Sequence, residues 1–243
     1  MILLVNCNSV TLIFNVVTLL TSCFFLKANV SFFSLLTHHP SVQMEITNKH
    51  NDLRRMTNPR ASNMLKMNWN AEVAKNAEKW ANRCTLSHSS RIANCGEKLF
   101  MSSAPLPWSH IIQVFYDEVK NFKYGVGDIR ANSKTGHYTQ LVWATSHQIG
   151  CALAHCPHKH LSYFYVCHYC PEGNNRNTKK TPYKKGKPCG DCPNNCDNGL
   201  CTNPCKYIDR FFNCADLVKE FGCDINITKE NCKATCRCSS EIK

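Results

Sequence analysis

Charged residues are absent from the first 26 positions of this 243-residue chain. These positions contain the apolar run 10–20, followed by Phe24, Phe25 and Leu26, a pattern typical of a secretory signal peptide, which we place at residues 1–28. The positive charge that usually precedes such a run is also missing. A signal anchor is therefore the alternative, because a helix that crosses a bilayer needs about 20 apolar residues.

Acidic residues are absent from residues 174–188, which carry six positive charges. We predict that residues 173–188, which contain Pro182 and Gly186, form a basic linker. The linker is either a solvated hinge kept open by its own repulsion or a segment that binds anionic lipid headgroups or sulfated glycans. Residues 189–243 are close to neutral, with seven basic and eight acidic side chains. Nucleic acid is not an expected partner of a secreted chain.

Cysteine, in contrast, is abundant, and ten of the 18 cysteines lie between Cys189 and Cys238. A short segment this rich in cysteine is a disulfide scaffold, because it buries too little apolar surface to fold without cross-links. Disulfides persist in oxidising compartments, so we expect an extracellular protein. Cys7 and Cys23 lie in the expected signal peptide, and the 16 others can form a closed framework whose pairing the spacing does not define.

Three amphipathic segments predict helices. Val42, Ile46 and Leu53 share one face of the first, and residues 69–80 repeat the pattern. Pro107 is well placed to begin the third helix. The buried stripe expected for that helix consists of Ile111, Ile112, Phe115, Val119 and Phe122.

Two segments, residues 149–156 and 161–169, predict buried strands because they are apolar or rich in aromatic and β-branched residues. No internal repeat is present, so the chain is not a repeat array. Helices around a few strands indicate an α+β fold for residues 36–172.

One cysteine spacing resembles a zinc ribbon, in which Cys167 and Cys170 pair with Cys189 and Cys192. Zinc binds thiolates, and the sulfurs of disulfides are not thiolates. In an oxidising compartment the same cysteines are therefore expected to form disulfides.

Two groups of side chains could also hold a metal. The first would bind a divalent ion or act as acid and base if it converged on a cleft, although exposed His and Glu are common without such a role. Its members are His88, Glu97, Glu118 and His137. The second lies in an expected hairpin loop, where solvated histidines are the alternative. Its members are His155, His158 and His160.

Two glycosylation sequons begin at Asn29 and Asn226. The first lies near the expected mature N-terminus. A glycan on the second would shade one face of the cysteine-rich segment.

Four motifs give the chain a resemblance to the CAP superfamily. Residues 136–146 (GHYTQLVWATS) and 164–174 (FYVCHYCPEGN) resemble its two signatures, and residues 50–54 (HNDLR) and 95–97 (CGE) resemble two further motifs. The cysteine-rich tail, with CTNPC at 201–205 and CKATCRC at 232–238, resembles that of vertebrate cysteine-rich secretory proteins. The ending SEIK and the box CHYC are most similar to those of epididymal, sperm-coating members.

This resemblance implies an α-β-α sandwich, the CAP domain, at residues 36–172. It implies a disulfide-rich hinge at 189–204 and, at 205–243, a domain similar to a small helical potassium-channel toxin. It places the four His and Glu candidates in one cleft that binds divalent metals in some relatives. The implied disulfides are Cys84–Cys156, Cys95–Cys170, Cys151–Cys167, Cys189–Cys196, Cys192–Cys201, Cys205–Cys238, Cys214–Cys232 and Cys223–Cys236.

The chain departs from the family near the cleft. Only ten residues separate Cys84 from Cys95, fewer than relatives usually carry, and the missing stretch rims the cleft. Lys98 stands where the family usually has Asn. A cation beside Glu97 favours the ionised carboxylate and competes with a metal.

The function that these patterns predict is a secreted, non-enzymatic, sperm-coating protein of the male reproductive tract. We expect it to take part in sperm maturation and sperm–egg interaction, to bind sperm-surface or egg-coat proteins and to modulate ion channels through the cysteine-rich domain. No cofactor is required, and zinc is expected to bind weakly. The alternatives are a metal-dependent hydrolase that uses the His/Glu cleft, against which no nucleophilic Ser or Cys is evident near either histidine, and a sterol or lipid carrier.

Four aromatic side chains of the cysteine-rich domain have two interpretations. A rigid disulfide scaffold can hold them exposed for binding at little entropic cost. The alternative is that they form the minimal core, and we expect this of about half of them. They are Tyr207, Phe211, Phe212 and Phe221.

Overall fold

The computed structural model describes residues 30–90 and 94–243. The expected signal peptide at 1–28, with Cys7 and Cys23, and the sequon asparagine Asn29 lie outside these residues. Within the described ranges, no helix has both the length and the apolar character that crossing a membrane requires.

The CAP domain is built on a four-stranded sheet with the strand order β1-β5-β6-β2. β1 (Asn68–Trp69) runs parallel to β5 (Gln148–His155), and the pairs β5–β6 and β6–β2 are antiparallel. β6 spans Tyr163–Cys170 and β2 spans Gly96–Ser102. The two central strands, β5 and β6, are buried on both faces, which is why each appears in the sequence as a nearly continuous apolar run.

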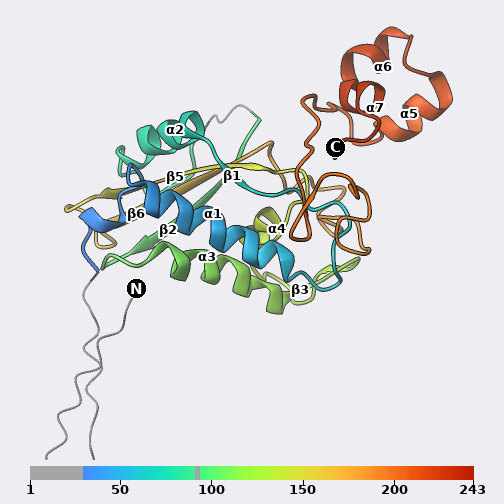
Figure 1. Cartoon of the computed structure of the whole chain (residues 1–243). Helices are drawn as coiled ribbons and strands as arrows, with labels where there is room; N and C mark the ends of the chain where they lie inside the picture. Colours follow the sequence, from blue (N-terminus) through green and yellow to red (C-terminus); the bar gives the residue numbers. More distant parts are fainter. Residues whose placement is uncertain (1–29, 91–93) are drawn as a thin grey trace, which may run out of the picture.

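Helices cover both faces of this sheet (Figure 1). α2 (Ala71–Ala81) lies on one face, where its Ala77 and Ala81 pack against the sheet. Asn70 caps its N-terminus by accepting hydrogen bonds from the amides of Glu72 and Val73. Gly150 of β5 allows α2 to approach closely, since a Cβ at this position would lie 2.0 Å from the Ala74 nitrogen.

The opposite face is covered by α1 (Pro40–Arg55), α3 (Trp108–Tyr116) and α4 (Gly136–Leu141). The expected α-β-α sandwich is therefore present. The expected third helix begins after Pro107 but is shorter than its apolar stripe, because the chain tightens into a 3-10 turn, η2 (Asp117–Asn121), and Phe122 belongs to β3 (Phe122–Lys123). β3 forms a small hairpin with β4 (Gly127–Asp128).

The basic linker is not a solvated hinge, and that alternative is wrong. Pro182 and Tyr183 are buried, and the amide of Ala144 donates to the carbonyl of Pro182 at 2.9 Å. Further backbone hydrogen bonds join the linker to Arg60 and Ser62. The net charge of the linker does not predict these contacts, because they are made by the side chain of Tyr183 and by backbone N–H and C=O groups that lie between the exposed lysines.

The hinge at 189–204 also packs on the CAP domain. Its hairpin consists of β7 (Cys196–Asp197) and β8 (Leu200–Cys201), and Cys201 exchanges backbone hydrogen bonds with Met64 and Lys66 at 2.7 and 2.8 Å. Ile242, near the end of the chain, is buried against Leu65 and the hinge disulfides. The CAP domain and the hinge therefore form one continuous body.

The cysteine-rich unit 205–243 contains three short helices and lies at one end of the molecule (Figure 1). These helices are α5 (Cys214–Phe221), α6 (Asn226–Asn231) and α7 (Lys233–Arg237). The structure contains the eight disulfides that the family resemblance implies. Three of them lie wholly inside this unit.

Candidate functional site

The first His–Glu pair joins His88 to Glu97 of β2. The Nδ1 atom of His88 lies 2.8 Å from Oε1 of Glu97, and the amide of Ser89 donates to the same oxygen at 2.9 Å. His168, the cross-strand neighbour of Glu97 on β6, lies 3.0 Å from Oε2 through its Nε2 atom. Burial alone would raise the pKa of Glu97, but hydrogen bonds from His168, Ser89 and His88 lower this pKa below its usual value.

The second pair joins His137 of α4 to Glu118 of η2. Nδ1 of His137 lies 2.7 Å from Oε1 of Glu118, and Oε2 accepts from the amides of His137 and Tyr138. The imidazole stacks on Phe115 with a centroid separation of 4.6 Å. Burial opposes ionisation of Glu118, yet the hydrogen bonds and the nearby His137 lower its pKa.

The two pairs lie on different sides of the sheet. Glu97 and Lys98 are consecutive residues of β2, so their side chains leave opposite faces. Leu99, on the Glu97 side, packs with α2, whereas Phe100, on the Lys98 side, contacts Phe115 of α3. The first pair is therefore on the α2 side of β2 and the second pair on the α3 side, and the four residues do not bring three ligand atoms within 4.8 Å of one another.

Lys98 adds a positive charge on the side of the second pair. Burial lowers the pKa of Lys98 to about 8, while the charges of Glu118 and Glu97 act in the opposite direction. Both carboxylates already accept three hydrogen bonds, so these residues do not fit a four-ligand metal centre. The Nε2 atoms of His88 and His137 are the donors that these pairs leave for a metal.

The other candidate metal sites are also not formed. The zinc-ribbon alternative is wrong, because its four cysteines belong to four different disulfides. Within residues 30–90 and 94–243, one group alone places three ligand atoms within 4.8 Å of one another, and all three of its members are disulfide-bonded. They are Cys189, Cys192 and Cys201. His155 stacks on Tyr163, and the exposed His158 and His160 do not join it in a ligand group.

The cysteine-rich unit exposes large apolar side chains. Six of the 13 exposed large hydrophobic residues found in the described ranges lie between positions 208 and 227. We call them the apolar set: Ile208, Phe211, Phe212, Phe221, Ile225 and Ile227. The expectation that about half of the four aromatics form the core is therefore too high. Only Tyr207 packs against the interior, which consists of Cys205, Ala234 and Cys238.

Sequence reasoning missed two features of these sites. In the sequence His168 stands out only as part of a signature, although its register opposite Glu97 makes it a hydrogen-bond partner. The isoleucines of the apolar set carry no motif. Asn226, the sequon asparagine, is exposed at the start of α6 between two members of that set.

The chain is a two-domain protein in which an α-β-α sandwich is followed by a small helical unit held together by disulfides. A family model described as "Cysteine-rich secretory protein family" matches residues 47–169, and one described as "Crisp" matches residues 189–243. The chain belongs to the cysteine-rich secretory protein family of the CAP superfamily.

Relatives of known name support this assignment. Human cysteine-rich secretory protein 2 is 53% identical over 218 residues, which cover 87% of this chain and 90% of that protein. Cysteine-rich venom protein helothermine from Heloderma horridum horridum is 53% identical over 216 residues, 86% of this chain and 89% of that protein. The crystal structure of NaASP2 with Zn²⁺ is similar at 29% identity and a TM-score of 0.57, covering 68% of this chain and 96% of that one.

Proposed function

We propose that this chain is a secreted, non-enzymatic binding protein that modulates an ion channel through residues 205–243. The observation that carries the proposal is the apolar set of the cysteine-rich unit. A small unit held by three disulfides has little interior, so its large apolar side chains remain in water. Fully burying an exposed side chain of this size contributes about 1.5–3 kcal/mol, and these side chains, which are 38–67% exposed, would each contribute about half of that against a partner.

The disulfides also lower the cost of binding. Phe212 and Phe221 are 67% and 49% exposed, and the backbone that carries them is fixed by the cross-links. A surface that is already ordered loses little conformational entropy when a partner binds. This combination favours a protein–protein contact, with a channel of the target membrane as the partner.

A hydrolase is less well supported by the same structure. Every cysteine of residues 30–90 and 94–243 is disulfide-bonded, so this part of the chain offers no thiol nucleophile. Glu97 and Glu118 have lowered pKa values and are held by hydrogen bonds, whereas a general acid at neutral pH needs a raised pKa.

We further propose that the protein coats sperm in the male tract and takes part in sperm maturation and sperm–egg interaction. The net charge of +12 favours adsorption to anionic cell surfaces. Lys180, Lys184, Lys185 and Lys187 remain exposed although their backbone is packed. Changing Lys180, Lys184 and Lys185 to Gln should weaken sperm binding at low salt, and unchanged binding at every salt concentration would assign adhesion to other surfaces.

Whole-cell current recording tests the channel proposal. The full-length secreted protein should alter a sperm channel current, and the double variant Phe221→Ser, Ile227→Ser should lose most of the effect. The matched control is Met44→Ser, Met56→Ser, which changes two exposed apolar side chains of α1 and its end. Equal loss of effect in both variants would refute a special role for the apolar set.

A further inference from the structure

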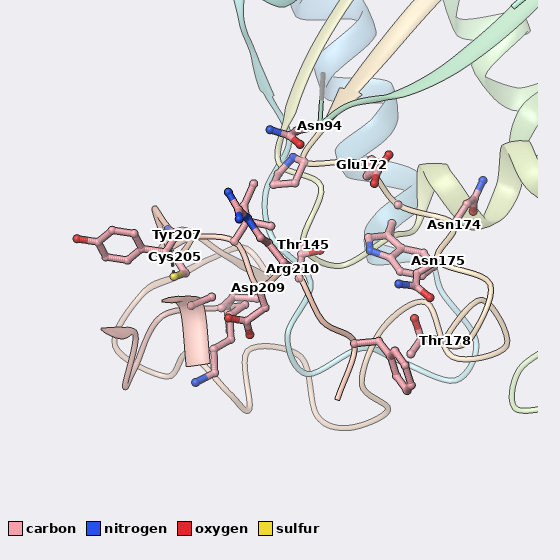
Figure 2. A pocket seen from close by; sticks show the side chains of 18 of the residues that line it. Asn94, Thr145, Glu172, Asn174, Asn175, Thr178, Cys205, Tyr207, Asp209 and Arg210 are labelled. Atoms are coloured by element: carbon pink, nitrogen blue, oxygen red, sulfur yellow. Dashed lines mark hydrogen bonds between the residues drawn. The ribbon is translucent and has the colours of Figure 1, made fainter. Parts of the chain in front are cut away.

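A cleft of about 620 Å³ separates the cysteine-rich unit from the CAP domain. Figure 2 shows Glu172, Asn174 and Asn175 on the CAP side, and Asp209 and Arg210 on the other side. The volume lies within the range of small-molecule sites, about 300–1,000 Å³. Its lining includes none of the four residues of the two His–Glu pairs and, of the apolar set, only Ile208 and Phe212.

The charged groups of the cleft divide into those with partners and those without. Both carboxylate oxygens of Asp209 accept hydrogen bonds from Thr235, and the Lys243 ammonium donates to the carbonyls of Thr235 and Cys238. Within the described residues, the guanidinium groups of Arg176 and Arg210 form neither a side-chain hydrogen bond nor an ion pair.

Glu172 is the remaining carboxylate, and no ion pair within 4 Å joins it to either arginine in the described structure. The free groups of the cleft therefore carry two positive charges and one negative charge. A guanidinium presents paired N–H donors that match a carboxylate or phosphate. The excess charge favours an anion.

Aromatic side chains also line the cleft. Trp143, His147 and Phe212 line it together with Ile208. Burial lowers the pKa of His147, so this ring is neutral at physiological pH. Such a lining accommodates a flat apolar body rather than a second charged group.

The backbone that carries these groups is held in place. The amide of Arg210 donates to the carbonyl of Asn231 at 2.7 Å, beside the Cys214–Cys232 disulfide. On the opposite wall, Gly173 packs so closely on Trp143 that a Cβ at this position would lie 2.6 Å from its Cγ atom. The backbone of Arg210 and the wall formed by Gly173 and Trp143 are therefore each held by contacts within their own side of the cleft.

We propose that this cleft binds a small organic anion, in which a carboxylate or phosphate pairs with Arg176 and Arg210 and an apolar ring body lies against Trp143 and Phe212. The site adjoins the channel-binding surface proposed above and shares Ile208 and Phe212 with it. It gives the protein a ligand-binding activity located at the junction of its two parts.

Isothermal titration calorimetry of the full-length protein tests this site with four matched probes. The probes are 2-naphthoate, 2-naphthyl phosphate, neutral 2-naphthalenemethanol and the 2-naphthylmethylammonium cation. We expect the two anions to bind and the neutral and cationic probes to bind at least about tenfold more weakly, because charge-assisted hydrogen bonds contribute most of the difference. The stronger of the two anions identifies the head group.

The variants Arg176→Gln and Arg210→Gln should each weaken anion binding about tenfold and leave the weak binding of the neutral probe unchanged. Arg210→Lys, which keeps the charge but not the paired donors, should be intermediate. Arg130→Gln, at an exposed arginine outside the cleft, is the control and should bind like the parent.

Three results would overturn the proposal. The first is equal affinity for 2-naphthoate and 2-naphthalenemethanol. The second is unchanged anion affinity in the double variant Arg176→Gln, Arg210→Gln, and the third is no heat of binding for any probe.

Discussion

Replacing Arg54 with Met should destabilise the whole CAP domain. This arginine, near the end of α1, is 1% exposed and forms no ion pair with any carboxylate of residues 30–90 and 94–243. Burial lowers its pKa to about 9, so it stays charged at neutral pH. Its five N–H groups instead make six hydrogen-bond contacts with five backbone carbonyls, at 2.7–3.1 Å, one N–H of Nη2 being shared between two carbonyls. These carbonyls belong to Leu65, Leu141, Trp143, Ala144 and Ser146.

The magnitude follows from those contacts. Met would leave four buried carbonyls without a donor, because the carbonyl of Ala144 still accepts from the amide of Leu65 at 3.1 Å. Each unpaired group costs about 1–3 kcal/mol. Removing the buried charge offsets part of this loss, because its desolvation is no longer required. The net destabilisation should be about 3–5 kcal/mol, the range measured when one partner of a buried charged network is removed.

Thermal unfolding followed by near-ultraviolet circular dichroism measures this loss. A destabilisation of this size lowers Tm by about 10 °C in a protein of this length. Arg54→Lys keeps three donors and should fall between the parent and Arg54→Met. Arg130→Met, at an exposed position, should unfold like the parent; an Arg54→Met variant with the same Tm as this control would refute the assignment of Arg54 as the organiser of segment 141–146.

Three further predictions concern the cysteines and the His–Glu pairs. Thiol titration of the denatured, unreduced secreted protein should find no free thiol, and one thiol per chain would contradict the paired framework. Zinc should bind the parent weakly and Lys98→Asn about tenfold more tightly, because this change removes a positive charge near the His–Glu pairs. Calorimetry measures the two affinities, with Lys75→Asn, at an exposed position, as the control. Equal zinc affinities of Lys98→Asn and the parent would refute this prediction. Folding lowers the pKa of Glu97. The ionised carboxylate therefore contributes fully to the free energy of unfolding above pH 4.5, the pKa of the unfolded chain, and this contribution is lost as the pH falls from there through the lower pKa of the folded protein. Denaturant unfolding between about pH 5 and pH 2.5 should therefore show a smaller loss for Glu97→Gln than for the parent, and equal losses would contradict this.

Periodic and apolar segments were predictable from the sequence. The helix that contains Val42, Ile46 and Leu53 and the strands β5 and β6 follow from residue patterns alone. β2 does not, because Lys98 and Glu97 interrupt its apolar residues and its pairing with β6 involves residues about 70 positions away. β1 has two residues, too few for a periodic signal.

The candidate site was less predictable than the fold. The sequence predicted that the four His and Glu residues converge on one cleft. Their arrangement as two hydrogen-bonded pairs, His88 with Glu97 and His137 with Glu118, depends on the register of β2. The packing of Pro182 and Tyr183 depends on carbonyl and amide groups of distant segments, which composition does not report. The exposure of the apolar set could not be predicted from the sequence, because it depends on cysteines, rather than large apolar side chains, occupying most of the interior of residues 205–243.

Current recording with separated parts of the chain tests most directly whether the cysteine-rich unit carries the channel-binding surface. Oxidised residues 203–243 retain three disulfides and the hydrogen bonds between Asn203, Cys205 and Ile242. This fragment should alter the current as the full-length protein does, whereas residues 30–202, which contain the CAP domain and hinge, should not. A current altered by residues 30–202 and not by the correctly oxidised fragment would contradict the proposed role of the apolar set.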